Sequence, residues 1–254
     1  MIALGVVAAV WLSKKRFMQK QIGKPDDASS IAMVAVPVGV VGARLYHVAT
    51  DWERFDGRFL DVFKIWQGGL GVWGGISFGV VAGVFVARKK GIPISAGLSC
   101  VAPALALAQS IGRWGNWFNQ ELFGKPTELF WALEVSAARA EDAGFVAGTT
   151  FHPTFLYESL GCLIICVGLI KVEKLWKLRE GSLFGLYVAS YTFLRFFVES
   201  LRIDKSKQLA GLRLNQWTSV VVFGCAVIYL IYANKFSKAA KTSDSPQDLQ
   251  GSRG

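Results

Sequence analysis

Charged residues are scarce in this chain: of its 254 residues only 18% are Asp, Glu, Lys or Arg, whereas 52% are apolar residues, aromatic residues or cysteine. A soluble domain carries about 25% charged residues and distributes its apolar positions along the chain. Here the apolar residues are pooled into long runs, and 13% of the residues are aromatic. This composition excludes an ordinary soluble domain and a disordered chain, and it indicates a polytopic membrane protein.

Histidine and cysteine are also rare, with two histidines and four cysteines in the whole sequence. Metal sites need clustered His, Cys, Asp or Glu ligands, and neither His47 nor His152 lies in such a cluster at ligand spacing. The cysteines all lie inside apolar runs, which is typical of packing residues and not of a disulfide framework. We therefore expect no metal and no cofactor. The cysteines are Cys100, Cys162, Cys166 and Cys225.

Six apolar runs are long enough to cross a membrane, because a helix of about 20 apolar residues spans roughly 30 Å of hydrocarbon. They are approximately residues 31–49, 68–87, 94–117, 153–171, 181–200 and 214–234. A seventh run, Met1–Leu12, would extend only about 18 Å as a helix, and we interpret it as a truncated first membrane helix. The basic cluster Lys14-Lys15-Arg16 follows this run instead of preceding it, which argues against a signal peptide.

The predicted fold is therefore an all-α polytopic membrane protein of about seven transmembrane helices, the first of them truncated. Residues 1–234 are expected to form one integral membrane domain, in which 118–152 is a small extracytoplasmic head region. Residues 235–254 are mostly polar, and we expect a disordered cytoplasmic tail there.

The distribution of basic residues between alternate loops predicts the orientation in the membrane. Sixteen Lys and Arg residues lie in the loops 14–30, 88–93, 171–180 and 235–254, whereas nine lie in the loops 50–67, 118–152 and 201–213. The first set is therefore predicted to be cytoplasmic, with the amino terminus outside and the carboxyl terminus inside. Contact of these loops with anionic lipid accounts for the net charge of +10, and no nucleic acid partner is needed.

Three arginines, Arg44, Arg113 and Arg195, lie inside the apolar runs. A charged side chain near the bilayer centre costs about 2.5–3.5 kcal/mol on insertion scales, so such a residue needs a partner or a wet cavity. Intramembrane arginines are therefore candidates for a functional site.

The densest polar stretch surrounds Arg113. Gly112 and Gly115 remove side-chain bulk beside it, and Asn116 and Asn119 follow at i+3 and i+6, on roughly the same helical face. A guanidinium offers paired donors that suit phosphate, and the amides suit ester or glycerol oxygens. The alternative is an aromatic belt at the helix end, in which the polar groups only anchor and cap the helix.

A second polar stripe consists of Tyr187, Tyr191, Arg195 and Glu199, spaced four residues apart within one apolar run. Arg195 and Glu199 can pair at i, i+4, which lowers the insertion free energy of both. The tyrosine hydroxyls need partners and favour a lined cavity, but a purely structural ion pair is the alternative interpretation.

Two further segments are less specific. His152 and Glu158 are ionisable residues at the start of the run 153–171, where the histidine either caps a helix or takes part in chemistry. The segment 67–79 carries six glycines within twelve residues, and these permit either close helix packing or the approach of a lipid head group.

Four segments together resemble the prolipoprotein diacylglyceryl transferase family, and they occur in the order found in that family. They are WQGGLGVWGGISFG at 66–79, GRWGNWFNQELFG at 112–124, FHPTFLYES at 151–159 and YTFLRFFVESLR at 191–202. The second is the long and specific motif. The resemblance extends from about residue 2 to residue 234.

The resemblance implies site residues by position. Arg113 would contact the lipid phosphate, and the rest of that subsite would comprise Asn116, Asn119, Glu121 and Gly124. Tyr191, Arg195 and Glu199 match the family's second functional helix, with Arg113, Arg195 and Glu199 expected to be catalytic and Tyr191 and His152 expected to bind substrate.

The resemblance also implies the reaction. The diacylglyceryl group of phosphatidylglycerol would be transferred to the lipobox cysteine of a prolipoprotein signal peptide, releasing glycerol 1-phosphate at the lipid bilayer of a bacterial cell membrane. Many members of the family have a histidine where this chain has Trp73, so a mechanism that uses that histidine as base cannot operate here. Glu121, Glu199, His152 and a tyrosine remain candidates for the base.

A membrane transporter, or another lipid-binding polytopic protein, is the alternative of a different class, because intramembrane Arg and Glu residues also mark substrate pathways. The chain has no internal repeat, and its polar residues gather at the predicted outer ends of the helices. Both features favour the transferase.

Overall fold

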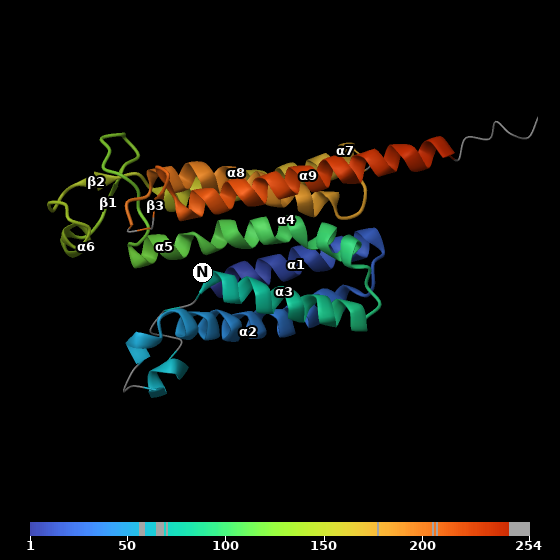
Figure 1. Ribbon diagram of the computed structural model, residues 1–254, viewed down its shortest axis with the longest axis horizontal. Helices are drawn as coiled ribbons and strands as arrows, with labels where there is room; N and C mark the ends of the chain where they lie inside the picture. Colours follow the sequence, from blue (N-terminus) through green and yellow to red (C-terminus); the bar gives the residue numbers. More distant parts are fainter. Residues whose placement is uncertain are drawn as a thin grey trace, which may run out of the picture. The chain divides into compact units, whose positions relative to one another are not determined.

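The computed structural model describes residues 1–55, 59–64, 69, 71–176, 178–204, 206 and 208–243. The helices in this part of the chain are α1 (Ile2–Lys20), α2 (Pro25–Thr50), α3 (Val72–Lys89), α4 (Ile94–Gly112), α5 (Trp114–Asn119), α6 (Ala137–Asp142), α7 (Thr154–Leu175), α8 (Ser182–Leu201) and α9 (Leu214–Ser243), with the short 3-10 helices η1 (Trp52–Phe55) and η2 (Phe59–Phe63) (Figure 1). Two short antiparallel sheets pair β1 (Leu133–Glu134) with β2 (Thr150–Phe151) and β3 (Gln208–Leu209) with β4 (Leu212–Arg213).

The predicted all-α polytopic membrane fold is confirmed. By length and composition, five stretches of the described residues can cross a membrane: Pro25–Thr50, Val72–Lys89, Ile94–Asn119, Thr154–Leu175 and Leu214–Ala233. The helix α8 has 20 residues, but it is not among these five stretches, and it carries Arg195 and Glu199. In α9 the helix continues to Ser243, and residues 244–254 of the predicted tail lie outside the described residues.

The first helix is longer than the sequence pattern indicated. The prediction of a 12-residue helix followed by a basic loop was wrong, because α1 continues through the basic cluster to Lys20. Arg16 is 4% exposed, and its guanidinium donates to the backbone oxygens of Ser99 and Cys100 at 3.0 and 2.8 Å. Pro103 has no N–H to offer the oxygen of Ser99 four residues earlier in α4, so Arg16 supplies the missing donor.

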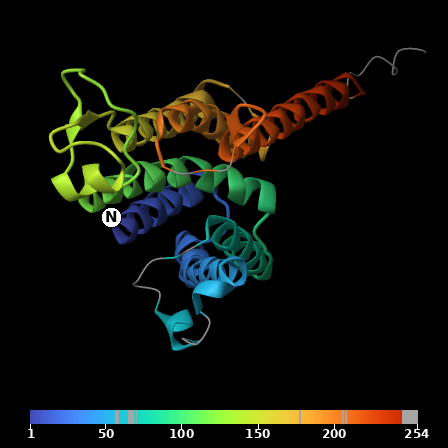
Figure 2. The same ribbon diagram turned by 60° about the vertical axis from the view of Figure 1, so that its left-hand side comes forward.

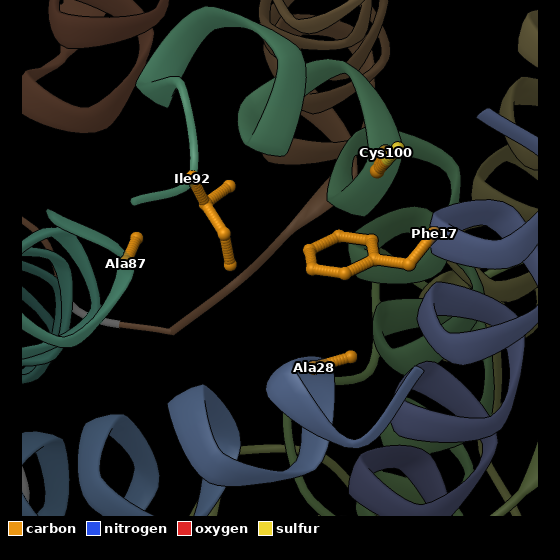
Figure 3. Close-up of a cluster of buried hydrophobic side chains, with 5 residues drawn as sticks. All are labelled: Phe17, Ala28, Ala87, Ile92 and Cys100. Carbon is orange, nitrogen blue, oxygen red and sulfur yellow. The ribbon is translucent and has the colours of Figure 1, made fainter. Parts of the chain in front are cut away.

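The chain divides into two compact units, Val6–Cys100 and Met1–Gly5 together with Val101–Gly254. The core of the first unit is built around Phe17, which is fully buried among residues of α1, α2, α3 and α4 (Figure 3). Its buried partners are Ala28, Ala87, Ile92 and Cys100.

Close contact between α2 and α3 explains the described part of the glycine-rich segment 67–79. Gln67, Gly68 and Leu70 lie outside the described residues. The two helices lie side by side in both views (Figures 1 and 2). A Cβ atom on Gly74 would collide with the backbone oxygen of Gly42, and one on Gly42 would meet Phe78. Gly39 and Gly79 face each other one turn further along. Of the two interpretations that the sequence left open, helix packing is the one that these contacts support.

In the second unit, α8 packs against both α7 and α9, and a small head of β1, α6 and β2 lies at one end of these helices (Figure 1). The head has its own apolar core, in which the rings of Phe123 and Phe151 lie 4.7 Å apart between centroids. Val135 and Ala140 complete this core. The head therefore places residues 120–153 next to the end of α8, the helix that carries the polar stripe.

Replacement of Gly74 by alanine tests the close contact between α2 and α3. The added methyl group has no space against the Gly42 backbone, so we expect the variant to lose roughly 1–3 kcal/mol of stability, as overpacked sites do. Gly83→Ala on the same helix is the matched control, because its Cβ would lie 3.6 Å from Ala35 and Ile31, an ordinary contact. Thermal unfolding in detergent compares the two, and equal midpoints would contradict the packing interpretation.

Candidate functional site

Four arginines and three carboxylates form a chain of ion pairs at the head end of the second unit. We call this group the charged cluster; it consists of Arg113, Glu158, Arg195, Glu199, Arg202, Asp204 and Arg213. Its members come from the junction of α4 and α5, from α7, from α8 and from the segment between α8 and α9. Residues remote in sequence therefore share one largely buried site.

Glu158 lies between the two arginines that the sequence singled out. Its Oε1 is 2.5 Å from the Nη2 of Arg113, and its Oε2 is 3.0 Å from the Nη1 of Arg195. The Tyr191 hydroxyl donates to Oε1 at 3.1 Å. Since this carboxylate side chain is only 3% exposed, the two guanidiniums compensate the free energy lost when it leaves water.

Glu199 is the second buried carboxylate, with a side chain that is 0% exposed. Its Oε2 is 2.7 Å from the Nη2 of Arg195, which confirms the predicted i, i+4 pair. On the other side, Oε1 lies 3.0 Å from Arg213 Nε and accepts a hydrogen bond from Asn215 Nδ2 at 3.0 Å. Arg195 is thus held between two carboxylates.

The polar stripe of α8 has partners along its length. The Tyr187 hydroxyl donates to Gln109 Oε1 of α4 at 3.0 Å, and the rings of Tyr187 and Tyr191 are stacked with centroids 6.2 Å apart. The Nη2 of Arg113 lies 3.3 Å from the Tyr191 hydroxyl, to which it donates. The tyrosines therefore join α4 and α7 to α8 through hydrogen bonds within the apolar region.

The segment between α8 and α9 closes the cluster. Arg213 Nη1 donates to the backbone oxygen of Arg202 at 2.6 Å, and its Nη2 lies 2.9 Å from Asp204 Oδ2. Arg202 Nε pairs with Asp204 Oδ1 at 2.6 Å. Burial raises the pKa of Asp204, but the hydrogen bond and charge of Arg202 and the charge of Arg213 outweigh this and hold the pKa below its ordinary value of 3.8.

The other residues of the long motif have different surroundings. Asn119 is exposed on α5, and its Nδ2 donates to Glu121 Oε1 at 3.0 Å. Asn116 lies on the same short helix and accepts the backbone N–H of Glu121 through its main-chain oxygen. These three residues lie beside Arg113 in sequence, but no ion pair or hydrogen bond described for their side chains joins them to the charged cluster.

Gly124 is a packing position at the junction of the head with α7 and α8. Its N–H donates to the backbone oxygen of His152 at 2.9 Å, and it forms an isolated β-bridge with Arg202. An added Cβ would lie 2.8 Å from His152 Cβ and 2.9 Å from Thr154 Cγ2. A larger residue would therefore push the head away from the helix ends.

His152 does not cap α7, so that interpretation was wrong. The helix begins at Thr154 after Pro153, with no side-chain cap hydrogen bond at this described end. The Nδ1 of His152 instead lies 3.0 Å from the Tyr157 hydroxyl, which also accepts the Trp131 N–H at 2.7 Å. Because the tyrosine oxygen accepts from the tryptophan, its single proton is free for the histidine nitrogen, which favours the Nε2–H tautomer.

Sequence reasoning placed three of the seven cluster members in the site and missed four. Glu158 was recognised as ionisable but was not joined to Arg113, although an acid inside an apolar run is itself a signal. Arg213 and Asp204 were assigned to an ordinary basic loop. No sequence signal connects that loop to Glu199, because the connection depends on how α8 and α9 pack.

An open apolar groove of about 430 Å³ lies on α7, α8 and α9. Phe193, Leu194 and Phe197 line it, and these residues flank Arg195 in α8. Its remaining lining residues are Gly161, Ile164, Ile165, Ala189, Ser190 and Phe223. Its shape and lining suit a hydrocarbon chain.

Arg44, the third arginine inside a run, belongs to the other unit and has a structural environment. Its Nε, Nη1 and Nη2 donate to the backbone oxygens of Val62, Gly69 and Asp61 at 2.8, 3.1 and 2.5 Å. The guanidinium also lies 5.2 Å from the ring centroid of Phe55. Arg44 therefore fixes the described part of the connection between α2 and α3.

Comparison with known proteins agrees with the motifs. The sequence profile of the family described as prolipoprotein diacylglyceryl transferase matches residues 1–232. A phosphatidylglycerol–prolipoprotein diacylglyceryl transferase of Streptomyces griseus is 49% identical over 237 residues, which cover 92% of this chain and 71% of the relative. The phosphatidylglycerol–prolipoprotein diacylglyceryl transferase 1 of Streptomyces coelicolor is 49% identical over 233 residues, which cover 91% of this chain and 66% of the relative. The Streptomyces avermitilis enzyme is 46% identical over 237 residues, covering 92% and 68%. The chain thus spans about two thirds of the length of these relatives.

Replacement of Glu158 by glutamine should destabilise the second unit strongly. Two buried guanidiniums would lose their common counter-charge, and breaking a buried ion pair costs about 3–5 kcal/mol. Glu121→Gln is the matched control, because this exposed carboxylate bonds to Asn119 at the surface and its loss should change stability by less than about 0.5 kcal/mol. Thermal midpoints in detergent measure both variants, and a Glu158→Gln midpoint equal to that of wild type would disprove the structural importance of this carboxylate.

Proposed function

The chain belongs to the prolipoprotein diacylglyceryl transferase family, and we propose that its charged cluster holds the phosphate of the lipid substrate in this family's reaction. That reaction moves the diacylglyceryl group of phosphatidylglycerol to a cysteine of a prolipoprotein. The protein is accordingly a transferase and a multi-pass membrane protein of a bacterial family.

The chemistry sets three requirements on the site. The cysteine sulfur of the acceptor forms a bond to the terminal glyceryl carbon, the bond between that carbon and its phosphate oxygen breaks, and glycerol 1-phosphate leaves with the bonding electrons. The thiol proton passes to a base. The site must bind one anionic phosphate, favour the thiolate, and stabilise the charge that grows on the leaving phosphate.

One observation carries the assignment of Arg113 and Arg195: both guanidiniums reach the same carboxylate, each through a different oxygen of Glu158. Two guanidiniums that converge on one carboxylate can also converge on two oxygens of one phosphate placed beside it. In this arrangement Arg113 and Arg195 are the catalytic pair, because they contact the group on which negative charge develops.

The neighbouring residues take supporting roles in the proposal. Tyr191 lies between Arg113 and Glu158 and can donate to the phosphate when the lipid is bound. Asn116 and Asn119 lie next to Arg113 on α5 and supply amide groups for the glycerol head group. Gly124 lets the head pack against the helix ends through its contacts with His152 and Thr154. In the proposal His152 and Glu121 contact the acceptor peptide.

Glu199 is better suited to positioning than to proton transfer. Its Oε2 lies 2.7 Å from Arg195 Nη2, and its Oε1 lies 3.0 Å from Arg213 Nε and accepts a hydrogen bond from Asn215 Nδ2. Both oxygens of this fully buried carboxylate are therefore in contact with groups of the protein itself. We therefore assign Glu199 the role of holding Arg195 in place. The sequence alone had placed it among the catalytic residues.

Orientation and partners follow from the distribution of charge. The connection between α7 and α8 is basic and lies at the opposite end of these helices from the head, so we propose that it faces the cytoplasm and that the head faces outward. In this orientation the amino terminus is outside and the carboxyl terminus is cytoplasmic. The lipobox of a signal peptide would meet the cluster at the outer surface of the bilayer, and an acyl chain of the lipid would lie in the apolar groove.

Replacement of Arg113 by lysine tests the phosphate role. Lysine keeps the charge but loses the paired donors, so we expect turnover to fall by about 10²-fold or more. The assay incubates purified protein with phosphatidylglycerol and a lipobox peptide, and detects the diacylglyceryl adduct by mass. Arg179→Lys, in the exposed turn between α7 and α8, is the matched control and should retain full activity. Unaltered turnover in Arg113→Lys would refute the role.

Replacement of all four cysteines should leave the transfer intact, because the reacting sulfur belongs to the acceptor. Cys100, Cys162 and Cys166 are buried, and Cys225 is on the exposed, apolar face of α9. We expect some loss of packing stability in the variant and no loss of the adduct. Alkylation of the peptide thiol should abolish the adduct. A folded but inactive four-cysteine variant would instead indicate a covalent intermediate on the enzyme.

A further inference from the structure

We propose that Arg213 is a positioning residue that neutralises Glu199 and thereby leaves the charged cluster with one positive charge for the substrate phosphate. Its Nε lies 3.0 Å from Glu199 Oε1, on the side of this carboxylate opposite Arg195. The inference rests on the function proposed above and extends it to a residue outside the four motif segments.

The hairpin of β3 and β4 holds the Arg213 side chain in one place. Its terminal nitrogens donate to the backbone oxygens of Arg202 and Asp204 at 2.6 and 2.7 Å, and Nη2 also lies 2.9 Å from the Asp204 carboxylate. The side chain of Gln216 accepts the Arg213 backbone N–H at 3.1 Å. Because all three guanidinium nitrogens are engaged by the protein, Arg213 affects substrate through Glu199 and not by direct contact.

The charges of the cluster explain why such a residue is needed. Arg113, Glu158, Arg195 and Glu199 form two arginines and two carboxylates, so this inner quartet has no net charge. Arg202 and Asp204 cancel each other in the same way. Arg213 is the remaining member, and over the residues joined by these ion pairs it leaves a net charge of +1.

A phosphodiester carries one negative charge, which matches this surplus. Without Arg213, the fully buried Glu199 would be left with Arg195 as its near cationic partner, since Arg202 Nε is 3.9 Å away. Arg195 would then be held by two carboxylates in a neutral cluster, and an incoming phosphate would add an uncompensated negative charge. Weaker binding of the lipid is the expected consequence.

The test compares Arg213→Gln with the double variant Arg213→Gln/Glu199→Gln, which restores the net charge of the cluster. In the transfer assay we expect Arg213→Gln to raise the KM for phosphatidylglycerol about tenfold or more, with a smaller change in kcat. The double variant should recover most of the lost KM, because the glutamine side chain keeps an oxygen that can accept from Arg195 and so can still position it. Arg139→Gln, an exposed arginine of α6 in the head, removes the same charge elsewhere and should leave KM unchanged.

Two further arms separate electrostatics from folding. Arg213→Lys keeps the charge without the planar fork, so its KM should stay within about threefold of wild type. Thermal unfolding identifies variants that fail to fold. If the double variant does not fold, Arg213→Lys decides the question: a folded lysine variant as impaired as the glutamine variant overturns the proposal. A folded double variant with no recovery overturns it as well.

Binding of phosphatidylglycerol vesicles without peptide distinguishes this proposal from the proposed function. If binding depends on Arg213 and Glu199 as described but no adduct forms with the lipobox peptide, the charge balance stands and the transfer role of the cluster fails. If transfer occurs and depends on Arg113 but binding is insensitive to Arg213, the function stands and the inference about Arg213 is wrong.

Discussion

A carboxylate shared by two arginines in the apolar region is the interaction on which the second unit depends. Glu158 brings together α4, α7 and α8, because its oxygens are bound by Arg113, Arg195 and Tyr191. None of these groups would be stable alone away from water, since each would lose its solvation without compensation. Together they form a preorganised set of donors with the geometry that an anion requires.

This arrangement also gives the site its sensitivity to charge. In a buried cluster the effective dielectric is lower than in water, so the addition or loss of one charge affects every member. The alternation of guanidinium and carboxylate groups from Arg113 to Arg213 keeps each charge next to an opposite one. The two carboxylates hold the arginines in fixed positions, while the segment between α8 and α9 sets the net charge.

The contact between α2 and α3 is built differently from the contacts around the charged cluster. In the unit Val6–Cys100, α2 and α3 approach closely because glycines face each other, and the backbone of Gly42 occupies the space beside Gly74. Such contacts provide van der Waals packing that lipid cannot replace. In the other unit, hydrogen bonds and ion pairs join the helices.

The sequence by itself determined the class of fold, the approximate extent of the five described stretches that can cross a membrane, and the i, i+4 pairing of Arg195 with Glu199. These features depend on the length of apolar runs and on spacing within one helix, which the order of residues specifies directly. Only the tertiary structure decided that Glu158 bridges Arg113 and Arg195, that Arg213 meets Glu199, and that Arg16 lies inside a helix beside the oxygen of Ser99. Periodicity identifies the face of a helix on which a residue lies. The residues that pack against that face depend on how separate helices rotate and pack against each other, and the spacing of residues within one helix does not specify that packing.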